Sequence, residues 1–127
     1  MESVRMLNQT GVQTAEHIGA LAYRALLEEV YTTPKPGLVD LATTGAHTDM
    51  DVHTFERSAA ALHPWFVRMA LEGETFQGTP RELFLKIRTY GIAAEQEMYR
   101  ATGGVNTHKG LVFTLGIFCA AAGRMKK

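Results

Sequence analysis

Two polar segments of this chain combine residue types that bind metal ions and phosphates. The first covers residues 33–51 and reads TPKPGLVDLATTGAHTDMD. Asp49 and Asp51 stand two residues apart there, in front of an expected helix. Paired carboxylates suit a hard cation such as Mg²⁺, which keeps several waters and bridges to substrate phosphates. An aspartate at a helix start also caps free backbone N–H groups, so the spacing alone leaves both roles open.

Other side chains of the same segment add to this chemistry. Lys35 and Asp40 precede the aspartate pair, and His47 and His53 flank it in the pattern H-x-D-x-D-x-H. Histidine is a common ligand of transition metals, but this spacing matches no strong zinc pattern. For a metal held by this segment, magnesium is therefore favoured over zinc.

The second polar segment, ATGGVNTHKG, covers residues 101–110 and directly precedes the apolar run LVFTLGIFCAAA. Its adjacent glycines permit close backbone approach and positive φ angles. We expect a helix to begin at Asn106 or Thr107, with His108 and Lys109 in its first turn. The free N–H groups and the dipole at a helix N-terminus attract an anion.

A lysine at that end of a helix indicates a bound anion, because the dipole by itself disfavours a cation there. The segment therefore predicts a phosphate site made by Lys109, the amides around residues 107–109, and Gly110. It matches neither established glycine-rich phosphate pattern. The alternative is a glycine-rich turn with a solvated lysine.

Three glutamates are further candidates for acid–base chemistry. Glu95 follows Ala94, which the helical period directs inward, so Glu95 is expected to border a pocket. Glu28 and Glu29 end the first expected helix, beside the proline-containing loop. The alternative for all three is a solvated carboxylate on a helix surface.

The elements that position these residues are helices. Hydrophobic periodicity predicts helices over residues 10–31, from 49 or 51 to 72, from 80 to just before 103, and from 106 or 107 to 122. Thr10 with Gln13, and Thr79 with Glu82, have the spacing of capping boxes. Pro64 predicts a kink or two shorter helices. Strand patterns are poor, so the predicted fold is all-α: a bundle of four to five helices with a long ordered loop between the first two.

The last expected helix is apolar on every side, which predicts burial on every side. It stands next to the final five residues of the sequence given. The expected cover is the first three helices, another chain in a homo-oligomer, or further sequence of a longer protein.

Composition narrows the class of protein. The 127 residues suit one domain, and 13 basic residues balance 13 acidic residues. Because positive charge is not in excess, we do not expect the chain to bind nucleic acid or a membrane surface over a broad area. The single Cys119 excludes a disulfide within the chain, and the first residues lack the apolar core of a signal peptide. We expect a cytoplasmic protein.

Taken together, the motifs TPKPGLVD, GAHTDMD and GVNTHKG, with Phe55 and Ser58 following the second, resemble the triphosphoribosyl-dephospho-CoA synthase family. The resemblance covers roughly residues 26–123. It implies an all-helical transferase that moves the triphosphoribosyl group of ATP to dephospho-CoA and releases adenine. The product is the prosthetic-group precursor of citrate lyase and malonate decarboxylase.

The resemblance also implies that the motif residues belong to the site, and the roles assigned to them are hypotheses. Magnesium is assigned to Asp49 and Asp51 with Asp40. The phosphates are assigned to Lys35, Asn106, Thr107, Lys109 and Gly110. His108 or Glu95 is the acid–base candidate.

One departure from the family pattern is length. Members of the family are expected to be about twice as long, with further motifs that this sequence lacks. Residues 1–127 are therefore expected to be one helical domain, the N-terminal part of a longer family domain. Two other functions remain open: a catalytically silent helical module that binds nucleotide or oligomerises, and a magnesium-dependent phosphohydrolase that uses GAHTDMD.

Overall fold

The computed structural model describes residues 2–31, 52–105, 107, 108 and 110–125, with side chains from residue 12 onward. Four helices account for nearly all of these residues: α1 (Glu2–Tyr31), α2 (Val52–Thr75), α3 (Pro80–Thr102) and α4 (Leu111–Met125). No strand occurs in the described ranges. The predicted all-α fold is confirmed, with four helices.

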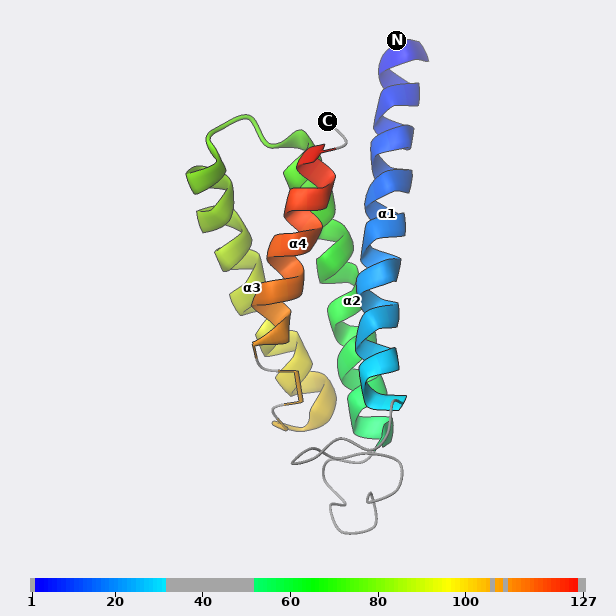
Figure 1. The fold of residues 1–127 in the computed structure, drawn as a ribbon, viewed down its shortest axis with the longest axis vertical. Coiled ribbons are helices and arrows are strands. Elements are labelled where there is room, and N and C mark those ends of the chain that lie inside the picture. Colours follow the sequence, from blue (N-terminus) through cyan, green and yellow to red (C-terminus); the bar gives the residue numbers. More distant parts are fainter. Residues whose placement is uncertain (1, 32–51, 106, 109, 126–127) are drawn as a thin grey trace.

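The helices run up and down alternately, and α2 packs against all three others (Figure 1). The first helix reaches beyond the rest at its N-terminal end. The core lies along α2, whose side chains at Leu62, Phe66 and Met69 are fully buried. Leu26 of α1, Met98 of α3 and Val112 of α4 meet them there. Burial of such apolar side chains is the main force that holds helices together.

Glycines allow α2 and α4 to approach very closely. A Cβ atom on Gly73 of α2 would overlap the carbonyl group of Ala120, and one on Gly123 of α4 would overlap that of Ala70. Only hydrogen fits between the two backbones at these points. The small residues of the apolar run therefore set the position of α4 against the centre of the bundle.

The helix ends differ from the predictions where local signals were weak. The first helix runs through Thr10 without a break, so the predicted start and capping box at that residue are wrong. The second helix is one continuous element with Pro64 inside it, rather than two shorter helices. The third begins with the predicted capping box, in which the side chains of Thr79 and Glu82 each accept a backbone N–H of the other.

Within this chain the fourth helix is not covered on every side, so the first three helices are not the complete cover expected for it. Val112, Gly116 and Cys119 face the core, whereas Phe118 is 66% exposed and Met125 is 86% exposed. Leu111 and Ile117 also remain partly exposed on the uncovered side. The reason is geometric, because three neighbouring helices in this arrangement contact only one side of α4.

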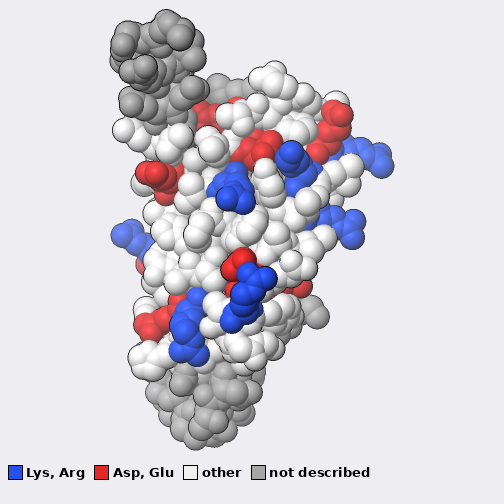
Figure 2. All heavy atoms as spheres, turned by 180° about the vertical axis from the view of Figure 1, so that it is seen from behind, with Lys and Arg blue, Asp and Glu red and all other residues white. Residues whose placement is uncertain are grey.

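Charged side chains are spread thinly over the surface. On the face shown in Figure 2, Lys and Arg side chains alternate with Asp and Glu, and uncharged surface lies between them. That face offers no continuous positive area of the kind that binds nucleic acid. Within the described residues, none of the helices combines the length and apolar character that crossing a membrane requires.

Candidate active site

Four helix ends meet at one end of the bundle. They are the C-terminal ends of α1 and α3 and the N-terminal ends of α2 and α4 (Figure 1). The connection from α3 to α4 begins with Gly103 at φ 70° and Gly104 at φ 94°. These left-handed conformations end α3 and are readily adopted only by glycine. They turn the chain so that Thr107 and His108 return to α2.

Thr107 and His108 join Ser58 of α2 in a buried polar cluster. The Thr107 hydroxyl donates a hydrogen bond to Ser58 Oγ. Ser58 Oγ lies 2.7 Å from His108 Nδ1. Ser58 is fully buried and His108 is only 3% exposed. The structure thus connects the GVNTHKG motif directly to the helix that follows GAHTDMD.

The surroundings of His108 favour the neutral imidazole. Burial lowers its pKa from 6.5 to about 4, and the negative charge of Glu29 on α1 opposes that shift in part. The ring of Phe55 meets the imidazole edge to face, with 5.3 Å between ring centroids. In a neutral histidine one ring nitrogen donates a hydrogen bond and the other accepts one, and the tautomer decides which is which.

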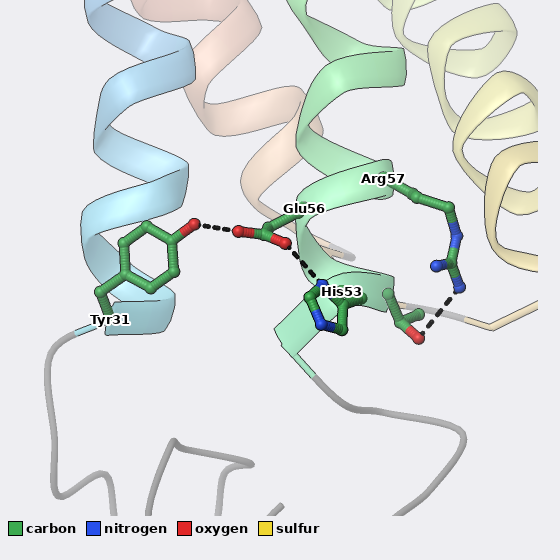
Figure 3. A network of polar contacts seen from close by, with 5 residues as sticks. Tyr31, His53, Glu56 and Arg57 are labelled. Atoms are coloured by element: carbon green, nitrogen blue, oxygen red, sulfur yellow. Dashed lines mark hydrogen bonds and ion pairs between the residues drawn. The ribbon is translucent and has the colours of Figure 1, made fainter.

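A second polar network lies at the same end, between α1 and α2 (Figure 3). Tyr31 donates its hydroxyl hydrogen to Glu56, and His53 Nδ1 lies 3.0 Å from the other carboxylate oxygen. The hydrogen bond to Glu56 raises the pKa of Tyr31. Beside this network, Arg57 donates to the Thr54 hydroxyl at 3.3 Å.

Sequence reasoning gave no role to Glu56, Tyr31 or Arg57, and it placed Ser58 only within the resemblance. Glu56 and Arg57 are charged residues in the first turns of a helix, where surface positions are common. The signal that identifies Glu56 is its contact with Tyr31 of α1, and this requires the fold. Arg57 donates to Thr54 of its own helix. His53 contacts Glu56 rather than any second histidine in the described residues.

Most of the predicted ligands fall outside the described residues. They are Lys35, Asp40, Asp49, Asp51, Asn106 and Lys109. Their assigned roles in magnesium and phosphate binding stay predictions. Glu95 lies half-buried in α3, and it makes no hydrogen bond or ion pair to any other described residue.

The predicted start of the fourth helix is wrong. Gly110 has a φ of 88°, which interrupts the helical path, so α4 begins at Leu111 and His108 precedes its first turn. The N–H groups of Leu111 and Val112 donate to the His108 carbonyl oxygen at 3.1 and 3.3 Å. These two N–H groups are therefore not free to bind an anion, and Thr107 has committed its hydroxyl hydrogen to Ser58.

The described residues do not themselves make a magnesium site. No three His, Cys, Asp or Glu side chains come together among them in a way that would hold a metal ion. Glu56 is the carboxylate best placed at this end, and Tyr31 and His53 already occupy its oxygens.

Comparison with known proteins adds independent information. Residues 15–127 match the profile of the ATP:dephospho-CoA triphosphoribosyl transferase family. A probable 2-(5''-triphosphoribosyl)-3'-dephosphocoenzyme-A synthase of Albidiferax ferrireducens is 55% identical over 111 residues, which are 87% of this chain and 37% of that protein. A probable synthase of the same name from Photobacterium profundum is 49% identical over 110 residues, or 86% of this chain and 35% of that protein.

The synthase of Klebsiella pneumoniae is 46% identical over 113 residues, covering 88% of this chain and 37% of its own length. The chain thus spans little more than a third of the length of these relatives, where about half was expected. No solved structure matches. The family profile covers the polar cluster and all of α2, α3 and α4, and the chain belongs to the ATP:dephospho-CoA triphosphoribosyl transferase family.

Proposed function

We propose that this chain carries the nucleotide-binding part of an enzyme that transfers the triphosphoribosyl group of ATP to dephospho-CoA and releases adenine. The product would serve the prosthetic group of citrate lyase or malonate decarboxylase, in the cytoplasm. The observation that supports this best is the contact of Ser58 with Thr107 and His108. It joins two motif regions at one end of the bundle, where a single ligand can touch both.

The reaction breaks the bond between the ribose and adenine, and positive charge develops on the sugar as that bond opens. A nearby carboxylate stabilises such a charge, as in glycoside hydrolysis. The described carboxylates at this end of the bundle include Glu28, Glu29 and Glu56. A general base then takes the proton of the attacking ribose hydroxyl of dephospho-CoA, and His108 and Glu95 are the candidates.

The triphosphate requires positive partners. In this proposal Lys35 and Lys109 contact the phosphates, and the backbone at Asn106, Thr107 and Gly110 lies against them. Asp40, Asp49 and Asp51 would hold Mg²⁺, which neutralises phosphate charge when bound. The described residues act by orienting the nucleotide and by keeping water from the buried cluster.

A chimera tests the proposal in a full-length context. The matching stretch of the Klebsiella pneumoniae synthase is replaced by this chain, and adenine release from Mg-ATP is measured with and without dephospho-CoA. Adenine release that depends on dephospho-CoA, and that His108→Ala reduces, is the expected result. Release of phosphate without adenine would instead indicate a phosphohydrolase. A folded chimera without either activity would contradict the proposal.

The uncovered side of α4 favours one second candidate, a catalytically silent helical module that assembles through this helix. Phe118 is 66% exposed there, and a groove between α3 and α4 is lined by Phe84, Ile87, Phe113 and Ile117. Apolar surface of this kind marks an interaction site. In the enzyme proposal the same surface is covered by further polypeptide. The matched part is only 35% to 37% of the length of the relatives, so they contain further polypeptide that could do this.

A further inference from the structure

The tautomer of His108 follows from the buried cluster. Thr107 donates its hydroxyl hydrogen to Ser58 Oγ, so Ser58 acts as an acceptor in that bond. Ser58 makes its other hydrogen bond to His108 Nδ1, and no third partner occurs among the described residues. A serine has one hydroxyl hydrogen to donate. With that direction for the bond between Thr107 and Ser58, Ser58 donates to Nδ1, and this assigns the proton of the neutral imidazole to Nε2.

The protonated nitrogen, His108 Nε2, is buried, and no hydrogen-bond partner for it occurs in the described part of the chain. A buried donor without an acceptor destabilises the fold, because it has lost its hydrogen bond to water. The imidazole is neutral at pH 7, because burial lowers its pKa to about 4. The free N–H thus remains a donor that an oxygen of a ligand can satisfy.

We propose that His108 Nε2–H donates a hydrogen bond to a phosphate oxygen of the bound nucleotide, and that Ser58 and Thr107 are positioning residues that fix its tautomer. The identity of the ligand rests on the proposed function. A phosphate oxygen fits best because it is a strong acceptor, and because Thr107 and His108 stand within the segment predicted to bind phosphate.

This arrangement removes His108 from the candidates for general base. Its Nδ1 is occupied by Ser58, and its Nε2 already carries a proton, so neither nitrogen can take one from the attacking hydroxyl.

The first experiment measures the tautomer directly. The chain is labelled with ¹⁵N and the His108 ring nitrogens are observed by NMR at pH 7. The wild type is expected to carry its proton on Nε2, and Ser58→Ala and Thr107→Val are expected to mix the two tautomers. Thr89→Val is the control, because its hydroxyl contacts only the carbonyl of Leu85 on the surface of α3. A proton on Nδ1 in the wild type would overturn the inference.

The same spectra show whether the oxygen that accepts from His108 Nε2–H belongs to a phosphate or to the nucleoside. Addition of inorganic tripolyphosphate with Mg²⁺ is expected to shift the Nε2–H signal, and adenosine is expected to leave it unchanged. A response to adenosine alone would overturn the assignment to phosphate.

The second experiment separates a donor from a base. Glutamine places an amide N–H near the position of Nε2 but has no basic nitrogen. By calorimetry, His108→Gln is expected to keep the wild-type affinity for Mg-ATP within about threefold, and His108→Ala to weaken it about tenfold, as the loss of one hydrogen bond predicts. In the chimera, His108→Ala is expected to reduce adenine release more than His108→Gln does.

Equal losses in the two variants would overturn the donor role while leaving the proposed function in place, provided that the unmodified chimera releases adenine. If the wild-type chain binds neither Mg-ATP nor tripolyphosphate, both the donor role and the proposed nucleotide site fail. The tautomer measurement is then judged separately, since it requires no ligand.

Discussion

Ser58 Oγ lies 2.7 Å from His108 Nδ1, across a separation of 50 residues in the sequence. Both side chains are buried, and the contact ties the segment before α4 to the second turn of α2. A buried polar pair of this kind is stable only when its hydrogen bonds are satisfied. Nε2 of the same imidazole has no hydrogen-bond partner among the described residues, and the proposed bond to a phosphate oxygen depends on this.

Acid sensitivity is expected to follow from the burial of His108. Its pKa is 6.5 ordinarily and about 4 in the folded chain, so the unfolded chain takes up a proton at a higher pH. The part of the free energy of unfolding that depends on neutral His108 is fully present above pH 6.5. It decreases by roughly 3 kcal/mol in total as the pH falls to 4 and below. Glu29 is the charged group that acts on this imidazole.

Urea unfolding at a series of pH values measures this effect, with His108→Gln as the comparison. Carboxylates titrate in both proteins, so the difference between the two curves isolates the histidine. The wild type is expected to lose more stability than His108→Gln between pH 6.5 and 4. Parallel curves would show that His108 does not titrate differently on folding.

The close approach of α2 and α4 predicts a sharp difference between two glycines of α4. Gly123→Ala is expected to destabilise the fold by several kcal/mol, because its Cβ would overlap the backbone carbonyl of Ala70. Gly116→Ala is the matched control: there the nearest atom is the Met69 sulfur at 2.5 Å, at the flexible end of a side chain. Thermal melts of the two variants compare them, and equal losses would contradict the packing.

Cys119 is expected to be unreactive in the folded chain. It is 3% exposed, and burial raises the pKa of its thiol to about 12. The thiolate is the reactive form, so a thiol reagent at pH 8 should label the native chain at least tenfold more slowly than the chain in urea. Rapid labelling without denaturant would indicate that α4 separates readily from α2.

The uncovered side of α4 is expected to control association. Phe118→Glu should increase solubility and reduce any oligomer seen by light scattering after gel filtration, because it places a charge on exposed apolar surface. Val12→Glu is the control, since Val12 is 42% exposed and belongs to α1 rather than to α4. If an oligomer persists in Phe118→Glu, the copies of the chain contact each other through another surface.

Local signals explain which parts of the fold were predictable. The start of α3 was predicted correctly because Thr79, Pro80 and Glu82 determine it within one turn. The start of α1 was missed because Thr10 also fits within a helix interior. The start of α4 depends on the backbone of Gly110, whose φ of 88° the sequence allows but does not require.

The sequence indicated which motif residues belong to the candidate site, but not which side chains contact each other there. Motif residues indicated His108 and Thr107, and the structure brings both to one buried cluster. Their partner Ser58 carries no local pattern, because a serine inside a helix has the same spacing whether it faces solvent or a histidine from another segment. The network of Tyr31 with Glu56 is likewise a contact between helices, which only packing creates.

Whether the two polar segments bind the same nucleotide can be measured by an NMR titration of the ¹⁵N-labelled chain with ATP and Mn²⁺ in place of Mg²⁺. The paramagnetic ion broadens amide signals near it. We expect broadening both at residues 49–51 and at residues 107–109, with Mg-ATP as the diamagnetic control. Broadening confined to one of these segments, or absent from both, would contradict the claim that they share one metal-bound triphosphate.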